Sequence, residues 1–339
     1  ELSEAYRLGW DADALQAAGK LAEALPLYEQ ALAIQEEALA PGDPRLAQTL
    51  EQLGIVHHKR EEYPRAEVFQ RRALAARLSA PHPDTGAVAR VYRNLAAAHE
   101  NQGHDAEAEV LYRHVLVMRE VALGPDHPLV GDILRLLAAL HMRQGAYAKA
   151  EPLALRAAPI LEKDLGEEHP TTVLNLLNIA AIHFAQGKLD EAEIPAMRAL
   201  AIRERTLPSD DILVAQALQT VAVVHVARGR YPEAEPLALR ALAILEKVGG
   251  PESLDTAYGA LTLAAVYYGQ GRYTEAERLV SQTLSVREKL LGPDDPGVAQ
   301  ALEAPAVIYR GMNDHDRAGV AEDRARAIHT GQPARETRK

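Results

Sequence analysis

Five histidines recur at one constant spacing along the chain, and tyrosine continues the series at the next two positions. The column reads His57, His99, His141, His183 and His225, then Tyr267 and Tyr309. Imidazoles at a regular spacing could bind a metal ion or take up protons as the pH falls. A zinc site needs further ligands, however, and the chain has no cysteine, no His-Glu-x-x-His motif and no dense carboxylate cluster beside these histidines. We therefore predict no metal site.

Packing is the interpretation that the histidine spacing favours. Each histidine follows apolar or small residues by three and four positions, as His99 follows Leu95 and Ala96. Such residues share one face of a helix, so the rings are expected on the packed face. Burial disfavours the charged imidazole and predicts pKa values below the unfolded value of about 6.5. The protein should then lose stability as the pH falls towards about 5.

Other groups that could carry chemistry lie in turns. The serines Ser79, Ser209 and Ser253 have no nucleophile motif around them. The adjacent carboxylates Glu167 and Glu168 precede a predicted helix, where acidic residues stabilise the N-terminus. No glycine-rich phosphate loop is present in the sequence. We predict a protein that is not an enzyme and that needs no cofactor.

Composition indicates an all-helical chain and limits its partners. Of 339 residues, 47% are hydrophobic and only 4% aromatic, so alanine and leucine dominate over the residues that favour strands. The net charge of −11 argues against nucleic acid and against anionic membranes as partners. No apolar run approaches the roughly 20 residues of a membrane helix, and the first residues do not resemble a signal peptide. We expect a cytoplasmic protein, and a start at Glu1 suggests an excerpt of a longer chain.

The chain repeats itself with a 42-residue period, which is also the spacing of the histidines. The stretch 229–247 matches the stretch 145–163, two periods earlier, at fourteen of nineteen positions, and a related stretch lies between them at 187–205. A turn residue recurs as Gly19, Gly103, Gly145, Gly187, Gly229, Gly271 and Asn313, with Glu61 in the second copy. Five positions later stands an alanine in every copy: Ala24, Ala66, Ala108, Ala150, Ala192, Ala234, Ala276 and Ala318. A methyl side chain at this place lets two antiparallel helices approach closely.

Each copy predicts a hairpin of two helices. Residues 169–187 begin with His-Pro, continue with leucines at helical spacing and end at Gly187, and a second helix is expected from about 190 to 205. The repeats are predicted at about 1–42, 43–84, 85–126, 127–168, 169–210, 211–252, 253–294 and 295–329. Together they form one domain, 1–329, whose first and last copies are degenerate caps. We expect Pro305 to interrupt the last first helix, and 330–339 to be a flexible basic tail.

A recurring phrase resembles the tetratricopeptide repeat family, in the 42-residue form of kinesin light chains. The phrase Y-x-x-A-E-x-L-x-x-R-A-L-x-I-x-E-x-x-L-G-P-x-H-P occurs in pieces at 147–162, 231–246 and 273–296. The resemblance implies a right-handed superhelical α-solenoid of about eight hairpins, whose first helices line a concave groove. Kinesin-light-chain repeats often carry two adjacent asparagines that can bind a peptide backbone, and here Asn94 and Asn178 keep one of each pair. The full Lys and Asn set with which chaperone-binding members grip a terminal carboxylate cannot be placed.

The residues predicted to face the groove change along the chain. Early copies present charged side chains, with Glu51, Glu100 and Asp132 among the basic residues Lys59, Arg90, Arg93, Arg135 and Arg143. Later copies present Leu174, Leu177, Phe184, Val226, Tyr258, Leu261 and Tyr268. With Asn94 and Asn178, the basic and apolar sets are the predicted binding residues for an extended peptide or helix with acidic and apolar segments. The alternative is a solvated charged face with an apolar set that packs against the next turn or a neighbouring copy.

Three functions fit the sequence. The first is a protein-interaction scaffold that binds a peptide or helix of a partner protein in the groove. The second is the recognition or sensor arm of a larger bacterial protein that carries a protease or an NTPase. The third is a structural rod that self-associates. The sequence does not identify the partner.

Overall fold

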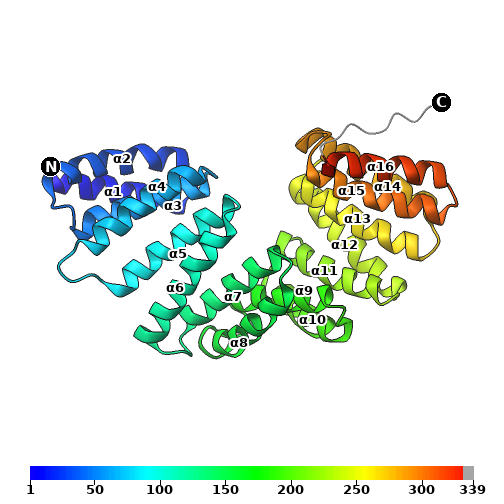
Figure 1. Cartoon of the computed structure of the whole chain (residues 1–339), viewed down its shortest axis with the longest axis horizontal. Helices are drawn as coiled ribbons and strands as arrows, with labels where there is room; N and C mark the ends of the chain where they lie inside the picture. The colour runs from blue at the N-terminus through cyan, green and yellow to red at the C-terminus, as the bar shows by residue number, and fades with distance from the viewer. Residues whose placement is uncertain (331–339) are drawn as a thin grey trace. The chain divides into compact units, whose positions relative to one another are not determined.

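The computed structural model describes residues 1–330 as sixteen α-helices, and no strand occurs in that range (Figure 1). The all-α prediction is confirmed. The first helices of the hairpins are α1 (Leu2–Ala17), α3 (Pro44–Lys59), α5 (Thr85–Asn101), α7 (Pro128–Arg143), α9 (Pro170–Ala185), α11 (Ile212–Ala227), α13 (Leu254–Gly269) and α15 (Pro296–Gly311). The second helices are α2 (Leu21–Ala38), α4 (Tyr63–Leu78), α6 (Asp105–Leu123), α8 (Tyr147–Leu165), α10 (Leu189–Thr206), α12 (Tyr231–Gly249), α14 (Tyr273–Leu291) and α16 (His315–Thr330). The predicted basic tail lies almost wholly outside the described residues.

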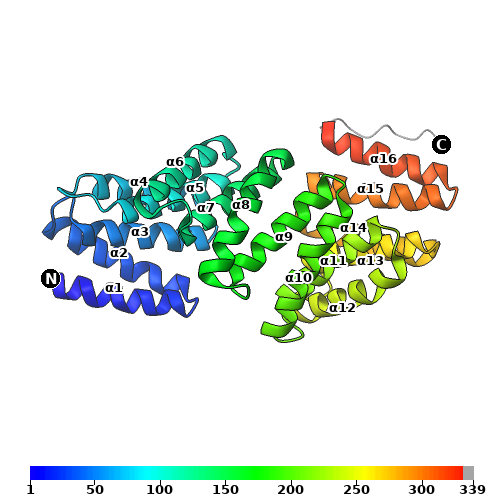
Figure 2. The ribbon, with the colours of Figure 1, turned by 90° about the horizontal axis from the view of Figure 1, so that it is seen from below.

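The chain divides into two compact units, which meet in sequence at Gly166 and Glu167. Unit 1 contains α1–α8 and unit 2 contains α9–α16. Within each unit, every first helix packs against the second helix of its own hairpin, and every second helix packs against the next first helix (Figures 1 and 2). The eight predicted hairpins are therefore present, and stacking within each unit buries faces that a lone hairpin would expose.

Local sequence signals set where the first helices begin. An aspartate caps several of them: the side chain of Asp43 accepts from the backbone N–H of Arg45 at 2.9 Å, and that of Asp295 from Gly297 at 2.7 Å. Proline follows each of these caps, where its missing N–H has no intrahelical partner to lose. His169 acts in the same way through Nδ1, 3.2 Å from the N–H of Thr171. The His-Pro start predicted for this helix is confirmed.

The turn inside each hairpin requires a left-handed backbone. Every glycine of the predicted turn column has a φ between 70° and 76°, a conformation that costs glycine little. The two exceptions, Glu61 and Asn313, adopt φ values of 61° and 59°. The backbone geometry is thus the same in all eight hairpins even where the residue type is not.

The alanine column lies at the centre of the hairpins. All eight alanines are buried, six of them completely. Ala108, for example, belongs to a cluster with Tyr112 of its own helix and Leu137 and Leu140 of the next first helix. The alanines therefore face the packed interior, as the predicted close approach requires.

The expected interruption at Pro305 is wrong. Helix α15 continues through this residue to Gly311. Pro305 is buried, as are Leu302 and Ala306 of the same helix, which belong to a core cluster. A proline inside a helix removes one hydrogen bond, and here packing of the apolar face holds the helix together across the gap. Proline also lies inside α8 and α10 without ending them.

Candidate functional site

The histidine column faces carboxylates of the neighbouring second helices. His57, His99, His141 and His225 are buried, and His183 is half-buried. The Nε2 atoms of His99, His141 and His225 lie 3.7, 3.8 and 3.4 Å from Glu67, Glu109 and Glu193 of the preceding hairpin. His57 instead contacts Glu62 of its own hairpin, with 2.5 Å between Nδ1 and Oε2. His99, His141 and His225 therefore each face one carboxylate of the preceding repeat, which fits packing between repeats.

Where tyrosine replaces histidine, an arginine still pairs with the carboxylate, as Arg230 pairs with Glu193 beside His225. The guanidinium of Arg272 lies 3.8 Å from the ring centre of Tyr267 and 2.8 Å from Glu235, the next carboxylate of the same column. The ring and the carboxylate both attract the cation. The column thus links neighbouring repeats through a charged contact whichever aromatic residue it contains.

Burial lowers the pKa of His225, and nearby Arg230 acts in the same direction. The unfolded chain therefore takes up a proton first as the pH falls, so the stability due to neutral His225 is present above about 6.5 and is lost below it. We expect the melting temperature to fall between pH 7.5 and pH 5.5. The variant His225→Tyr should show a smaller fall, since Tyr267 and Arg272 show that the site accepts tyrosine beside an arginine. Thermal unfolding followed by circular dichroism measures this.

An exposed histidine supplies the control for that experiment. His82 lies in the link before α5 and is exposed, so His82→Tyr should leave the pH dependence of the wild type unchanged. Equal slopes for the wild type and His225→Tyr would contradict a role for His225. The carboxylates Glu67, Glu193 and Glu235 have lowered pKa values beside their hydrogen-bond and charge partners. They titrate below the pH range of this test.

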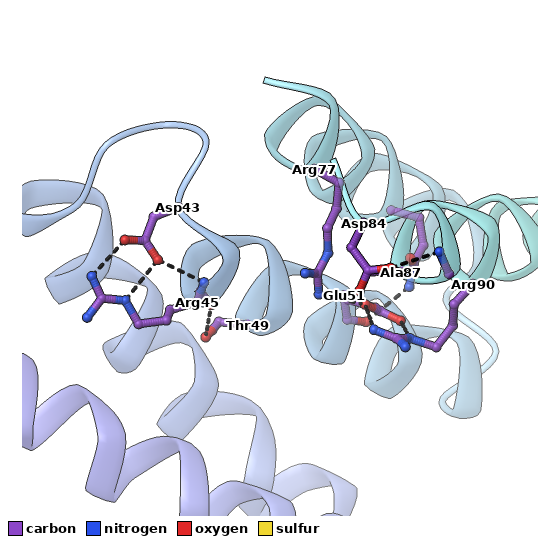
Figure 3. A network of polar contacts seen from close by, with 10 residues as sticks. Asp43, Arg45, Thr49, Glu51, Arg77, Asp84, Ala87 and Arg90 are labelled. Carbon is purple, nitrogen blue, oxygen red and sulfur yellow. Dashed lines mark hydrogen bonds and ion pairs between the residues drawn. The ribbon is translucent and has the colours of Figure 1, made fainter. Parts of the chain in front are cut away.

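The predicted basic residues of unit 1 lie on the first helices, but four of the five are paired within the protein. Arg90 forms a hydrogen-bonded ion pair with Glu51, with 2.5 Å between Nε and Oε1, and this contact raises the pKa of Arg90 (Figure 3). Arg93 and Arg135 both contact Asp132, at 3.2 and 3.0 Å. Arg90 and Arg93 therefore join neighbouring hairpins, whereas Arg135 pairs with a carboxylate of its own helix.

Among the described residues, Arg143 is paired with carboxylates of the protein, whereas Lys59 is not. Arg143 of α7 contacts Asp105 at 2.5 Å and Glu100 at 3.5 Å. Lys59 at the end of α3 is exposed, and it forms no ion pair with any residue from 1 to 330. Lys59 is thus the predicted cation that keeps its charge available to a partner.

A cavity of about 290 Å³ lies between α3 and α5, which we call the unit-1 pocket. Lys59, Arg93 and Asn94, all predicted site residues, line it. His58 also lines it, and burial lowers the pKa of that ring. At neutral pH the charge at this pocket is therefore supplied by Lys59 and Arg93. The complete lining is Gly54, Ile55, His58, Lys59, Gln70, Arg93, Asn94 and Ala97.

A second cavity, of about 270 Å³, lies between α13 and α15, which we call the unit-2 pocket. The predicted residues Leu261 and Tyr268 line it. Its walls are almost entirely apolar, and Glu303 is the single charged residue among them. The complete lining is Leu261, Ala264, Ala265, Tyr268, Val280, Glu303, Ala304, Val307 and Ile308.

The two pockets occupy the same place in the repeat. Seven of the eight positions that line the unit-1 pocket recur, five periods later, in the lining of the unit-2 pocket. Gln70 corresponds to Val280, Arg93 to Glu303 and Asn94 to Ala304. One backbone frame therefore presents a polar, cationic pocket in unit 1 and an apolar, anionic pocket in unit 2.

The other predicted site residues lie on first helices of unit 2, outside this pocket. Leu174 and Tyr258 are exposed, whereas Leu177, Phe184 and Val226 are half-buried. Leu177 and Val226 pack against the core clusters below them. On the two predicted asparagines, Asn94 and Asn178, the Nδ2 atom is buried and has no hydrogen-bond partner within the described part of the chain. Such a donor is available to an incoming carbonyl group if the side chain turns outward.

The sequence predicted five of the lining residues, and among those that it missed are Gln70, Val280 and Glu303. Gln70 and Val280 belong to second helices and form the floors, and Glu303 was not predicted although it follows Leu261 by one period. Gln70 reaches the unit-1 pocket because Gly54 has no side chain, and a Cβ at that position would overlap the Nε2 atom of Gln70. The 42-residue spacing from Leu261 indicates Glu303, whereas Gln70 and Val280 lie on second helices, outside the predicted groove face.

Across residues 1–330, no group of three or more His, Asp or Glu side chains is placed to hold a metal ion. None of the helices in that range combines the length and the apolar composition that crossing a bilayer requires.

Solved structures with the same fold include other repeat proteins. Nearly identical TPR-like repeats from Podosopora anserina, assigned as a kinesin light chain, are 25% identical and cover 61% of this chain and 98% of that chain, with a TM-score of 0.53. A Rap protein complexed with competence and sporulation factor is 15% identical, with coverages of 97% and 98% and a TM-score of 0.61. A STAND protein with a tetratricopeptide repeat sensor from Pyrococcus horikoshii is 14% identical, with coverages of 91% and 44% and a TM-score of 0.62. The last two likenesses show the fold alone.

Sequence comparison points to the same family. No curated protein sequence matches the chain. A family model of the tetratricopeptide repeat matches residues 12–79, 87–163, 130–205, 213–279 and 255–330. These matches extend over most of both units and agree with the 42-residue period, the helical hairpins and the kinesin-light-chain resemblance. The chain therefore belongs to the tetratricopeptide repeat family.

Proposed function

We propose that this protein is a non-enzymatic interaction scaffold that binds a peptide or helix of a partner protein on the face of its first helices. The observation that carries the proposal is the pair of pockets at the same repeat position, five repeats apart. A repeat that served stacking alone would need the same lining in each copy, since its packing contacts are the same. Here the helical frame is kept, whereas the pocket linings differ in charge and polarity.

The residues available to a partner differ between the two units. In unit 1, Lys59 and the buried Nδ2 donor of Asn94 suit a carbonyl or carboxylate oxygen. In unit 2, the exposed Leu174 and Tyr258 and the pocket residues Leu261 and Tyr268 suit apolar side chains. The Rap protein found among the structural neighbours is itself complexed with competence and sporulation factor. This supports a peptide or protein partner in general terms.

Site-specific photo-cross-linking tests which face binds. We would place p-benzoylphenylalanine at Ala97 and Ala265, which line the two pockets, and at Val68 and Val320, which are exposed on second helices. Each variant is irradiated in native lysate, and cross-linked proteins are identified by mass spectrometry. We expect one partner to be captured from positions 97 or 265 and not from 68 or 320. Capture from the second helices alone would rule out the proposal.

A second candidate function is the sensor arm of a larger protein. The STAND protein from Pyrococcus horikoshii carries a tetratricopeptide repeat sensor, and the match to it covers 91% of this chain but 44% of that one. The reading frame around this chain tests the idea, because a sensor arm is continued by a further domain. A reading frame that ends close to both termini of this chain would contradict it.

A further inference from the structure

We infer that the unit-2 pocket binds an aliphatic side chain of a partner protein that has a lysine or arginine one or two residues away. This inference rests on the proposed function and adds the chemistry of the segment that is bound. It is based on the size of the pocket, on its apolar walls and on the carboxylate of Glu303, which pairs with no cation among the described residues.

The size of the pocket suits a side chain. A volume of about 270 Å³ lies below the range of about 300–1,000 Å³ typical of small-molecule sites. Leu261, Val280 and Val307 come from three different helices and surround the cavity with methyl groups. Burying one aliphatic side chain there contributes roughly 1.5–3 kcal/mol to binding before the entropy of ordering is subtracted.

The wall formed by Tyr268 is held in place by its neighbours. Its ring lies 5.5 Å from that of Tyr273, at an interplanar angle of 57°. Gly311 makes room for both rings, since a Cβ at this position would lie 2.7 Å from Tyr268 and 3.0 Å from Tyr273. The pocket is therefore shaped before a ligand arrives, which reduces the cost of binding.

The charge beside the pocket selects the neighbouring residue of the ligand. The four first helices of unit 2 contain three Asp, Glu, Lys or Arg residues: Asp255, Glu303 and Arg310. Asp255 lies in the first turn of α13, where a carboxylate stabilises the helix end. Arg310 lies 2.5 Å from Glu322. Glu303 is exposed, and among the described residues no cation pairs with it.

Comparison with unit 1 shows that this charge is not a requirement of the fold. The corresponding residue there is Arg93, which contacts Asp132. The position therefore tolerates either sign, and the carboxylate at 303 leaves one negative charge at the edge of an apolar face. A cation of the ligand gains from this charge, whereas a carboxylate at the same place is repelled.

A methyl-NMR titration with designed peptides tests the inference. The probe is a blocked ten-residue Gly/Ser peptide with one leucine and one arginine two residues apart, added to the full chain at about 50 mM salt. Two comparison peptides carry glutamine in place of the arginine, or serine in place of the leucine. We expect the first peptide to shift the methyl signals of Leu261, Val280 and Val307, and the serine peptide to leave them unchanged.

Two variants separate the roles of charge and cavity. Glu303→Gln should weaken binding of the Leu/Arg peptide about threefold and leave the Leu/Gln peptide unaffected. Ala265→Phe, at an exposed position of the lining, should abolish binding of both. Glu191→Gln on α10 and Ala227→Phe on α11 are the controls, since both positions are exposed and neither lines the pocket.

Several results would overturn the inference. If the leucine and serine peptides bind equally well, the pocket does not recognise the aliphatic side chain. If Glu303→Gln binds the Leu/Arg peptide as tightly as the wild type does, the carboxylate does not recognise the cation. Methyl shifts that depend on protein concentration without peptide mean that a second copy covers the pocket. If cross-links still come from positions 97 or 265, only this inference fails. Cross-links confined to second helices reject the proposed function instead.

Discussion

Leucine in place of Ala108 is expected to lower the free energy of unfolding of unit 1 by about 1–3 kcal/mol. Ala108 is completely buried, and its methyl group packs in a cluster with Tyr112, Leu137 and Leu140. Protein interiors are close-packed, so three additional carbon atoms force the helices of the hairpin apart or push side chains from their rotamers. Urea denaturation followed by circular dichroism measures the loss as a lower midpoint.

The same substitution two residues earlier provides the control. Ala106 lies in the first turn of the same helix and is exposed. Leucine and alanine have similar helix propensities, so Ala106→Leu should change stability by less than about 0.5 kcal/mol. Equal midpoints for the two variants would show that the close approach at Ala108 is not needed for the hairpin.

The hairpins could be predicted because their signals are local and recur. Asp-Pro and His-Pro starts, left-handed turns and buried alanines each act within a few residues, and eight copies average out the exceptions. Pro305 is the exception, because helix propensity predicts a break there and α15 continues through it. Contacts of Leu302 and Ala306 with other core residues outweigh the lost hydrogen bond there.

The sequence predicts that the candidate site lies on the face of the first helices, but it does not predict which of the side chains there are free to bind a partner. The period places Arg90 and Arg93 on the first helices, but it does not show whether a carboxylate of a neighbouring hairpin pairs with them. Those pairs join residues 39 apart, as Arg90 joins Glu51 and Arg93 joins Asp132. Each of these ion pairs depends on the residue types in two neighbouring repeats, so the residues at a single repeat position do not predict it.

A second contact that the sequence does not reveal comes from a column of the second helices that holds either arginine or leucine. Arginine occupies it at positions 77, 119, 203 and 287, and leucine at 161 and 245. Arg119 donates to the carbonyl oxygen of Leu129 at 2.7 Å, and Arg287 to that of Gly297 at 2.9 Å. Burial lowers the pKa of Arg119. Each carbonyl group belongs to the first turn of the next first helix, a contact that spacing alone does not reveal.

Removal of the Glu51 carboxylate is expected to lower the free energy of unfolding by about 3 kcal/mol, at least as much as leucine at position 108. Its side chain is 4% exposed and lies between two arginines, 3.4 Å from Arg77 and 2.5 Å from Arg90 (Figure 3). Arg90 is about half exposed and can turn to solvent, but the side chain of Arg77 is only 11% exposed. Glu51→Ala therefore leaves a buried guanidinium without its counter-charge. Urea denaturation again measures the change.

An exposed pair of the same residue types tests whether burial is the cause. Arg72 and Glu36 join neighbouring hairpins in the same way, and both side chains are 44% exposed. Water screens such a pair, so Glu36→Ala should cost less than about 1 kcal/mol. A similar loss for Glu51→Ala and Glu36→Ala would contradict the argument from desolvation.

A double variant tests whether the cost comes from the unpaired arginine. Leucine replaces Arg77 at the corresponding positions 161 and 245, where Leu161 and Leu245 are buried. Arg77→Leu should therefore be accommodated, and Glu51→Ala should cost less in that background than in the wild type. We expect a coupling energy of about 1–3 kcal/mol, as for residues that share one ion-pair network. Additive losses would mean that Glu51 stabilises unit 1 through Arg90 or through packing instead.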